Sequence, residues 1–167
     1  TGPQNTSTTE DGAYFINGYN STDGRTIQRE AGWKWAVTSE DEWYKAAYYK
    51  GGSANAGYWD YPTRSDTAPS KAGADDYTDP GNHANYYNYG FTIGSPYYRT
   101  KVGEFENSAG PYGTFDQGGN VWEWNEEAIA DVNGARRGMR GGSFSYYSYL
   151  SASFNTGYYP NFEDGTF

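Results

Sequence analysis

The sequence predicts a loop-rich α+β domain with short strands and few helices. Glycine is abundant, at 23 of 167 residues, and the mean hydropathy is low, at −0.98. Both values indicate extensive loops between short elements. One stretch carries strong helix signals, while several short stretches alternate as strands do. The length favours a single domain, residues 1–167, that can bury a core.

The core must be largely aromatic. The chain has 19 Tyr, 8 Phe and 6 Trp, while hydrophobic residues of all kinds reach 35%. Such an aromatic content argues against disorder. Each buried tyrosine or tryptophan needs a hydrogen-bond partner for its polar tip.

The helix signals lie in the sequence TSEDEW. Ser39 and Glu42 have the spacing of a capping box, and three acidic residues fall in the first turn. The pattern predicts a helix over residues 40–49 that ends before two glycines, with Trp43, Ala46 and Ala47 facing inward. We expect its acids to cap the helix and to face solvent, not to catalyse a reaction.

The remaining elements are short. Residues 1–12 read as a linker or edge segment, residues 13–16 and 33–37 as strands, and residues 50–88 mainly as loop. A further strand is expected at residues 101–105. Residues 125–133 suggest the end of a strand and a turn, and residues 137–144 a glycine-rich basic strand.

Composition excludes several classes of function. The formal net charge is −9, and the one basic cluster, Arg136, Arg137 and Arg140, is too small for a nucleic-acid surface. No apolar run is long enough for membrane insertion. The absence of cysteine excludes disulfides, thiolate metal sites and thiol catalysis. His83 is the single histidine, and we expect it in a loop or on the surface, because zinc and iron sites usually need two or three.

The densest motif is GGNVWEW, residues 118–124. We expect Trp122 and Trp124 in the core. The side-chain oxygens of Asp116, Asn120 and Glu123 lie close in sequence and suit a hard cation. A hydrogen-bonded turn without metal is the alternative.

Five blocks match a known family in order and spacing: VTSEDEWYKAA (37–47), YWDYP (58–62), VGEF (102–105), GGNVWEW (118–124) and RGGSF (140–144). With these blocks the chain resembles the formylglycine-generating, or sulfatase-modifying factor, family, which has a variant of the C-type lectin fold. It is most similar to bacterial exported members, which implies an extracellular or cell-surface location. The family pattern also implies segments beyond both ends, so we expect the chain to be incomplete at both termini.

The resemblance implies loss of catalysis. The family's catalytic cysteines would fall near Ser145 and Leu150, where this chain has none. The related sulfoxide synthases bind iron through three histidines, and this chain has one. We therefore expect no enzymatic activity, and a degenerate enzyme ranks as the last alternative.

The resemblance also implies structural calcium as a cofactor. Its ligands would be the side chains of Asp116 and Glu123 and the carbonyls of Gly119 and Val121. A second family site would begin at Asn85 and Tyr86, but its later acid is not evident.

The end of the chain, residues 143–167, differs in composition. Nine of its 25 residues are Tyr or Phe, it has no Lys or Arg, and Ser, Asn and Gly are common. This composition is typical of recognition surfaces, and it fits the variable proteins of diversity-generating retroelements, some of which have this fold. An aromatic core segment is the alternative. The candidate contact residues are Ser145, Tyr146, Tyr147, Tyr149, Phe154, Tyr158, Tyr159 and Phe162.

Two functions follow from these patterns. The first is a non-enzymatic extracellular binding module that recognises a protein or glycan ligand through the C-terminal segment. The second is a structural subunit of a bacterial surface or filamentous assembly, which associates with itself through exposed sheet edges.

Overall fold

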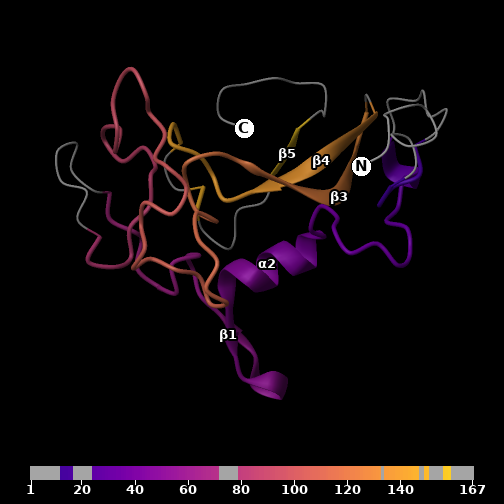
Figure 1. Ribbon diagram of the computed structural model, residues 1–167, viewed down its shortest axis with the longest axis horizontal. Coiled ribbons are helices and arrows are strands. Elements are labelled where there is room, and N and C mark those ends of the chain that lie inside the picture. The colour runs from indigo at the N-terminus through magenta and orange to yellow at the C-terminus, as the bar shows by residue number, and fades with distance from the viewer. Residues whose placement is uncertain are drawn as a thin grey trace.

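In the computed structural model a helix lies beneath a twisted antiparallel sheet, and long loops form the other end of the molecule (Figure 1). The structure describes residues 12–16, 24–71, 79–132, 134–146, 149–150 and 156–158. Among them, no helix has the length and apolar character needed to cross a membrane. The α+β architecture with short strands and few helices is as expected from the sequence.

The described elements follow one another as η1 (Gly24–Thr26), α2 (Glu40–Tyr48), β1 (Tyr49–Gly51), η2 (Ser53–Asn55), β2 (Gly57–Tyr58), β3 (Glu123–Asp131), β4 (Gly134–Arg140) and β5 (Thr156–Tyr158). Strands β1 and β2 form a small antiparallel hairpin that projects beyond the end of α2 (Figure 1). In the larger sheet, β4 lies between β3 and β5, and both pairings are antiparallel. The β3–β4 register shifts between Trp124 and Ala128.

The helix begins as predicted. The amide of Glu42 donates to Ser39 Oγ at 3.1 Å, and the amide of Ser39 donates to Glu42 Oε2 at 2.8 Å, which completes the capping box. Trp43 is buried as expected, and the helix ends one residue earlier than predicted. Ala46 is only half-buried, because it lies beside the inward face of the helix, which consists of Trp43, Ala47 and Tyr48; Tyr48 was not predicted to face inward.

Two small clusters of buried side chains form much of the described core. Trp43, Ala47 and Tyr48 make the first, and Ala84, Tyr86 and Leu150 make the second. The hydroxyl of Tyr48 donates to the Leu150 carbonyl at 3.0 Å, and that of Tyr86 to the Pro69 carbonyl at 2.5 Å. The expectation of an aromatic core with paired polar tips is confirmed.

Two predicted strands were wrong. Residues 33–37 form no strand, and at Val37 side chains rather than a neighbouring strand bind the backbone. The amide of Val37 donates to Tyr14 Oη at 3.0 Å, and its carbonyl accepts from Arg29 at 2.9 Å. Residues 101–105 form turns, in which the Glu104 amide donates to the Lys101 carbonyl. Alternating sequence makes a strand only where a partner strand is present.

The other strand predictions were partly right. Within residues 13–16, Tyr14 makes an isolated bridge to Arg29 and no full strand. Strands β3 and β4 occupy the expected regions, but β3 already begins inside the motif at Glu123. The chain leaves β4 at Arg140, before the predicted end, because Gly141 and Gly142 have positive φ.

Arg29 joins three parts of the fold. Its guanidinium lies 2.8 Å from Glu42 Oε2 on α2 and 2.9 Å from Glu126 Oε1 on β3. The Arg29 guanidinium, followed by the Ser39 amide, lowers the pKa of Glu42 from 4.5 to about 2. The hydroxyl of Tyr14 donates to the same Glu126 carboxylate.

Because the pKa of Glu42 is lower in the folded chain, its ionised form stabilises the fold above pH 4.5, and this contribution is lost as the pH falls towards about 2. Glu42→Gln should therefore lower the melting temperature at neutral pH and flatten its decline between about pH 5 and pH 3. Thermal unfolding followed by circular dichroism at several pH values tests this. Asp41→Asn, a change of an exposed acid in the same turn, should keep the wild-type slope. Parallel declines in wild type and Glu42→Gln would contradict the assignment.

Candidate functional site

The GGNVWEW motif is a tight turn fixed between two other segments. Asp116, Gly119 and Asn120 all have φ between 61° and 79°. A Cβ on Gly119 would lie 2.3 Å from the Asn85 carbonyl oxygen, so this position requires glycine. The Gly119 amide donates to the Gly141 carbonyl at 2.8 Å, and the Asn120 amide donates to the Asn85 carbonyl at 2.7 Å. The motif therefore joins the Asn85 segment to the RGGSF block.

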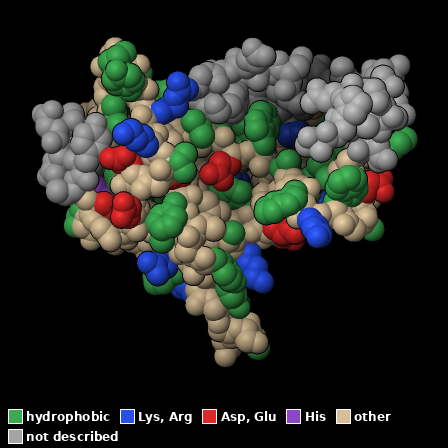
Figure 2. Space-filling model, in the orientation of Figure 1, with side chains coloured by type: hydrophobic (Ala, Val, Ile, Leu, Met, Phe, Trp, Pro, Cys, Tyr) green, Lys and Arg blue, Asp and Glu red, His purple; other side chains and the backbone are tan. Residues whose placement is uncertain are grey.

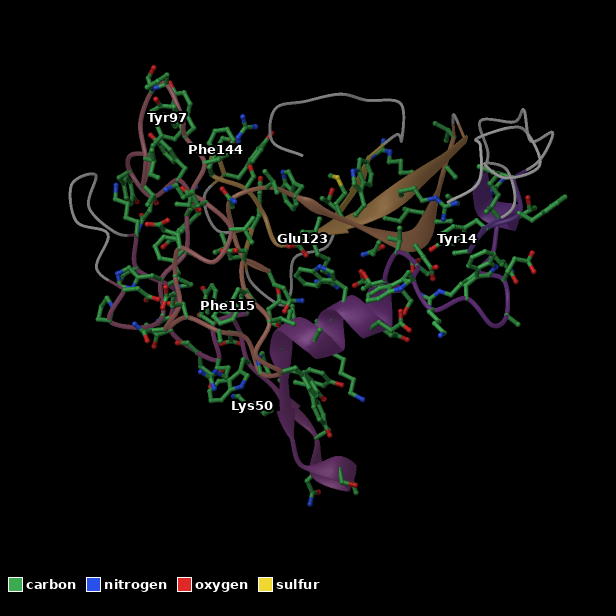
Figure 3. All side chains as sticks on the ribbon, viewed as in Figure 1. Tyr14, Lys50, Tyr97, Phe115, Glu123 and Phe144 are labelled. Carbon is green, nitrogen blue, oxygen red and sulfur yellow. The ribbon has the colours of Figure 1, made fainter. Side chains whose placement is uncertain are left out.

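Of the two predicted carboxylate ligands, Asp116 acts on Glu123 through its charge. Glu123 is the first residue of β3 and lies above α2 (Figure 3), where its Oε2 accepts from the indole Nε1 of Trp43 at 2.5 Å. Burial raises the pKa of Glu123 to about 7. The indole hydrogen bond opposes this shift, and the charge of Asp116 adds to it. Asp116 Oδ2 accepts the Gly103 amide at 2.6 Å. A local excess of negative charge in a partly buried place suits a cation.

Main-chain oxygens would have to complete any metal site. Within the described residues, no three His, Asp or Glu side chains converge on one point. Asp116 and Glu123 would thus need carbonyls such as those of Gly119 and Val121, which lie on the turn between them. The donor set is oxygen only, which fits calcium better than zinc.

Asn85 is fully buried at the place of the second predicted site. Its Nδ2 donates to the Tyr98 carbonyl at 3.0 Å and to Asn120 Oδ1 at 3.2 Å. Its Oδ1 has no hydrogen-bond partner among the described residues. Tyr86, the other predicted residue, packs in the core against Leu150.

The first part of the C-terminal segment forms an aromatic cluster with the motif. The ring of Trp122 lies 5.8 Å from the rings of both Tyr146 and Tyr149, and those two rings are 5.4 Å apart. Tyr146 is 40% exposed, while Ser145 and Tyr149 are half-buried. The remaining candidate residues Tyr147, Phe154, Tyr159 and Phe162 and the side chain of Tyr158 lie outside the described part of the chain.

Two other residues differ from expectation. Trp124 is only half-buried, whereas Trp122 is buried as predicted. His83 lies in a loop, but its side chain is largely buried, with Nδ1 3.0 Å from the Gly81 carbonyl oxygen. Asp79, which binds the amides of Gly81 and Asn107, organises this loop.

Two surface features were not predicted from the sequence. One is a pocket of about 760 Å³ between the N-terminal loops and β3, whose walls include Ile27, Val37 and Trp124. The other is a loop in which Tyr98 packs on Phe91 and Phe144, at ring distances of 4.9 and 5.7 Å. Both combine residues that are far apart in the chain, so no local pattern indicates them.

Comparison with known proteins places this chain in a family. The family described as the sulfatase-modifying factor enzyme 1-like domain matches residues 8–165. A crystal structure of CarF is similar with a TM-score of 0.54 and 20% sequence identity, over 83% of this chain and 46% of CarF. This chain thus spans less than half the length of that structural neighbour, and the likeness shows a shared fold. A comparison with curated proteins found no match. The sequence has no cysteine, so the family's catalytic cysteines are absent. The chain belongs to the sulfatase-modifying factor enzyme 1-like family.

Proposed function

We propose that the chain is a non-catalytic, extracellular binding domain that recognises a protein or glycan through the surface around Tyr146. The cluster of Trp122, Tyr146 and Tyr149 is the observation that carries this proposal. It follows the RGGSF block, where the resemblance would place the catalytic cysteines. Leu150, near one of those positions, is instead 1% exposed and packs in the core.

The chemistry of this surface suits binding. Tyrosine offers a large, rigid contact area with a polar tip, and its immobilisation costs little conformational entropy. The rings of Trp122 and Tyr149 pack against Tyr146 and restrict its motion, so part of this conformational entropy is lost before a ligand binds. The Tyr- and Ser-rich composition of residues 143–167 also supports a diversified, retroelement-type variable segment.

The binding proposal is tested with a glycan array and a panel of purified extracellular proteins, followed by titration of the best ligand. Tyr146→Ala should weaken that ligand at least about tenfold, as expected for an aromatic hot spot. Tyr58→Ala, which removes a similarly exposed tyrosine from the β1–β2 hairpin, should leave affinity unchanged. Equal affinity of the Tyr146 variant would contradict the proposed surface, and formylglycine production by the wild-type chain would contradict the non-catalytic assignment.

We also propose that calcium binds at Asp116 and Glu123, with the carbonyls of Gly119 and Val121 as further ligands. The support is the charge of Asp116 acting on the partly buried Glu123, with both residues at the ends of a tight turn. A cation would offset the cost of that buried charge and stabilise the turn that joins the motif to the RGGSF block. Its role would be structural.

Calcium titration by calorimetry and thermal unfolding tests this proposal. Calcium should raise the melting temperature of the wild type, and a chelator should reverse the rise. Glu123→Gln should weaken calcium binding at least about tenfold, because it removes one of two charged ligands. Glu127→Gln, which removes an exposed acid on the same strand, should behave as wild type. A wild-type melting temperature that is the same in calcium and in chelator would refute the site.

Self-assembly is a second candidate function, and one observation favours it. Large apolar side chains gather on the segments that border the 760 Å³ pocket: Phe15, Ile16, Trp33, Trp35 and Val37 are all exposed, with Trp35 at 88%. Such a concentration is typical of surfaces covered by a partner. We propose that a second copy of the chain covers this end in an assembly.

Light scattering over a range of concentrations tests self-assembly. The wild type should form dimers or larger species, and Trp35→Ala should shift the equilibrium towards monomer by about tenfold or more. Val132→Ala, a change of an apolar residue that is 97% exposed at the end of β3, should have no effect. A wild type that stays monomeric at high concentration would exclude this function.

A further inference from the structure

A concave site lies in the loop that follows Phe91. It is a pocket of about 430 Å³, and its walls are Ile93, Tyr97, Arg99, Thr100, Lys101 and Glu104. Pockets of about 300–1,000 Å³ commonly hold small ligands. None of these residues belongs to the Asp116–Glu123 turn or to the C-terminal segment, so the pocket is a separate site.

The loop is fixed to the core from within. The Thr100 amide donates to Asn120 Oδ1 at 3.1 Å, and Asn85 Nδ2 donates to the Tyr98 carbonyl at 3.0 Å. Tyr98 stacks against Phe144, while the next residue back, Tyr97, is 75% exposed. Tyr97 stands at the outer end of the loop region, far from Glu123 (Figure 3). The inward residues therefore hold the pocket walls in place, which reduces the entropy lost on binding.

The charge of the pocket is opposite to that of the protein. Arg99 and Lys101 both line it, in a chain whose net charge is −9. Figure 2 shows Lys or Arg side chains next to the hydrophobic side chains at the top of the loop region. An anion is repelled by most of the surface and attracted here. Arginine matches the planar geometry of a carboxylate, which it binds with two parallel hydrogen bonds.

The other residues of the pocket restrict the class of ligand that can bind. Glu104 is an acceptor, so an anion can approach it only if the ligand also brings hydrogen-bond donors. Tyr97 and Ile93 provide apolar contact, and the negative face of a tyrosine ring attracts C–H groups. Thr100 is 9% exposed, and its Oγ1 has no hydrogen-bond partner among the described residues. Thr100 therefore closes the inner wall of the pocket, and the ligand is bound by the exposed side chains around it.

We propose that this pocket binds a carboxylate-bearing sugar, such as a terminal uronic acid of a polysaccharide. The sugar carboxylate pairs with Arg99 and Lys101, its C–H face packs on Tyr97, and its hydroxyls donate to Glu104. The inference deepens the proposed binding function by naming a ligand class, and it places that ligand outside the Tyr146 surface.

The test is calorimetric titration of the wild-type chain with a short oligogalacturonate and with its fully methyl-esterified form. The acid should bind, the ester should bind at least about tenfold more weakly, and affinity for the acid should fall with added salt. Arg99→Met, Lys101→Met and Tyr97→Ala should each weaken binding several-fold. Tyr89→Ala, which removes a 90% exposed tyrosine from a neighbouring loop, should bind as wild type.

Three results would overturn the inference: no binding of the oligogalacturonate, equal binding of acid and ester, or tighter binding of a sulfated oligosaccharide or of free glutamate. The substituted pocket side chains are exposed, so we expect the variants to fold. Melting temperatures equal to that of the wild type verify this. The Tyr146→Ala variant distinguishes failure of the pocket proposal from failure of the proposed Tyr146 surface. If Tyr146→Ala retains full affinity for the array ligand while Arg99→Met loses the oligogalacturonate, the pocket stands and the Tyr146 surface fails.

Discussion

The carboxylate of Glu40 holds the two layers of this fold together. It lies in the first turn of α2, where the helix dipole favours negative charge. Arg140 Nε, at the end of β4, donates to its Oε1 at 2.6 Å, and Asn125 Nδ2, on β3, donates to its Oε2 at 2.5 Å. Removal of one partner from a buried pair costs about 3–5 kcal/mol, because the other charge stays buried. This contact fixes α2 beneath the sheet, and Trp43 thereby reaches Glu123.

The same contact sets the path of the chain beyond β4. After Arg140, two glycines turn the backbone so that Gly141 accepts the Gly119 amide and the Phe144 amide donates to the Asn120 carbonyl. Phe144 then stacks with Tyr98 of the pocket loop. The predicted calcium turn, the Tyr146 surface and the pocket loop therefore share one rigid frame. Because the frame is rigid, a ligand at any of them meets side chains that are already ordered.

The sequence predicted the parts of the fold that depend on local interactions. The helix follows from Ser39 and Glu42, which cap it within four residues. The strand at residues 33–37 failed because a long-range contact, from Arg29 and Tyr14, takes the hydrogen bonds that a strand would need. The early start of β3 at Glu123 has the same kind of cause, since Arg140 pairs with it from a distant part of the chain. Neither contact leaves a local pattern.

The candidate sites also differ in how far the sequence predicts them. Asp116 and Glu123 lie seven residues apart, and the turn between them could be read from glycine and asparagine in the motif. The pocket at Tyr97 could not be predicted from the sequence, although its residues are also close in sequence. Which of them line the pocket depends on which side chains face the core and which face solvent. Tyr97 and Tyr98 are chemically identical, but Tyr98 packs against Phe91 and Phe144 while Tyr97 is exposed. In an acidic, tyrosine-rich chain, composition predicts a recognition surface, and packing decides which aromatic rings and which cations are exposed on it.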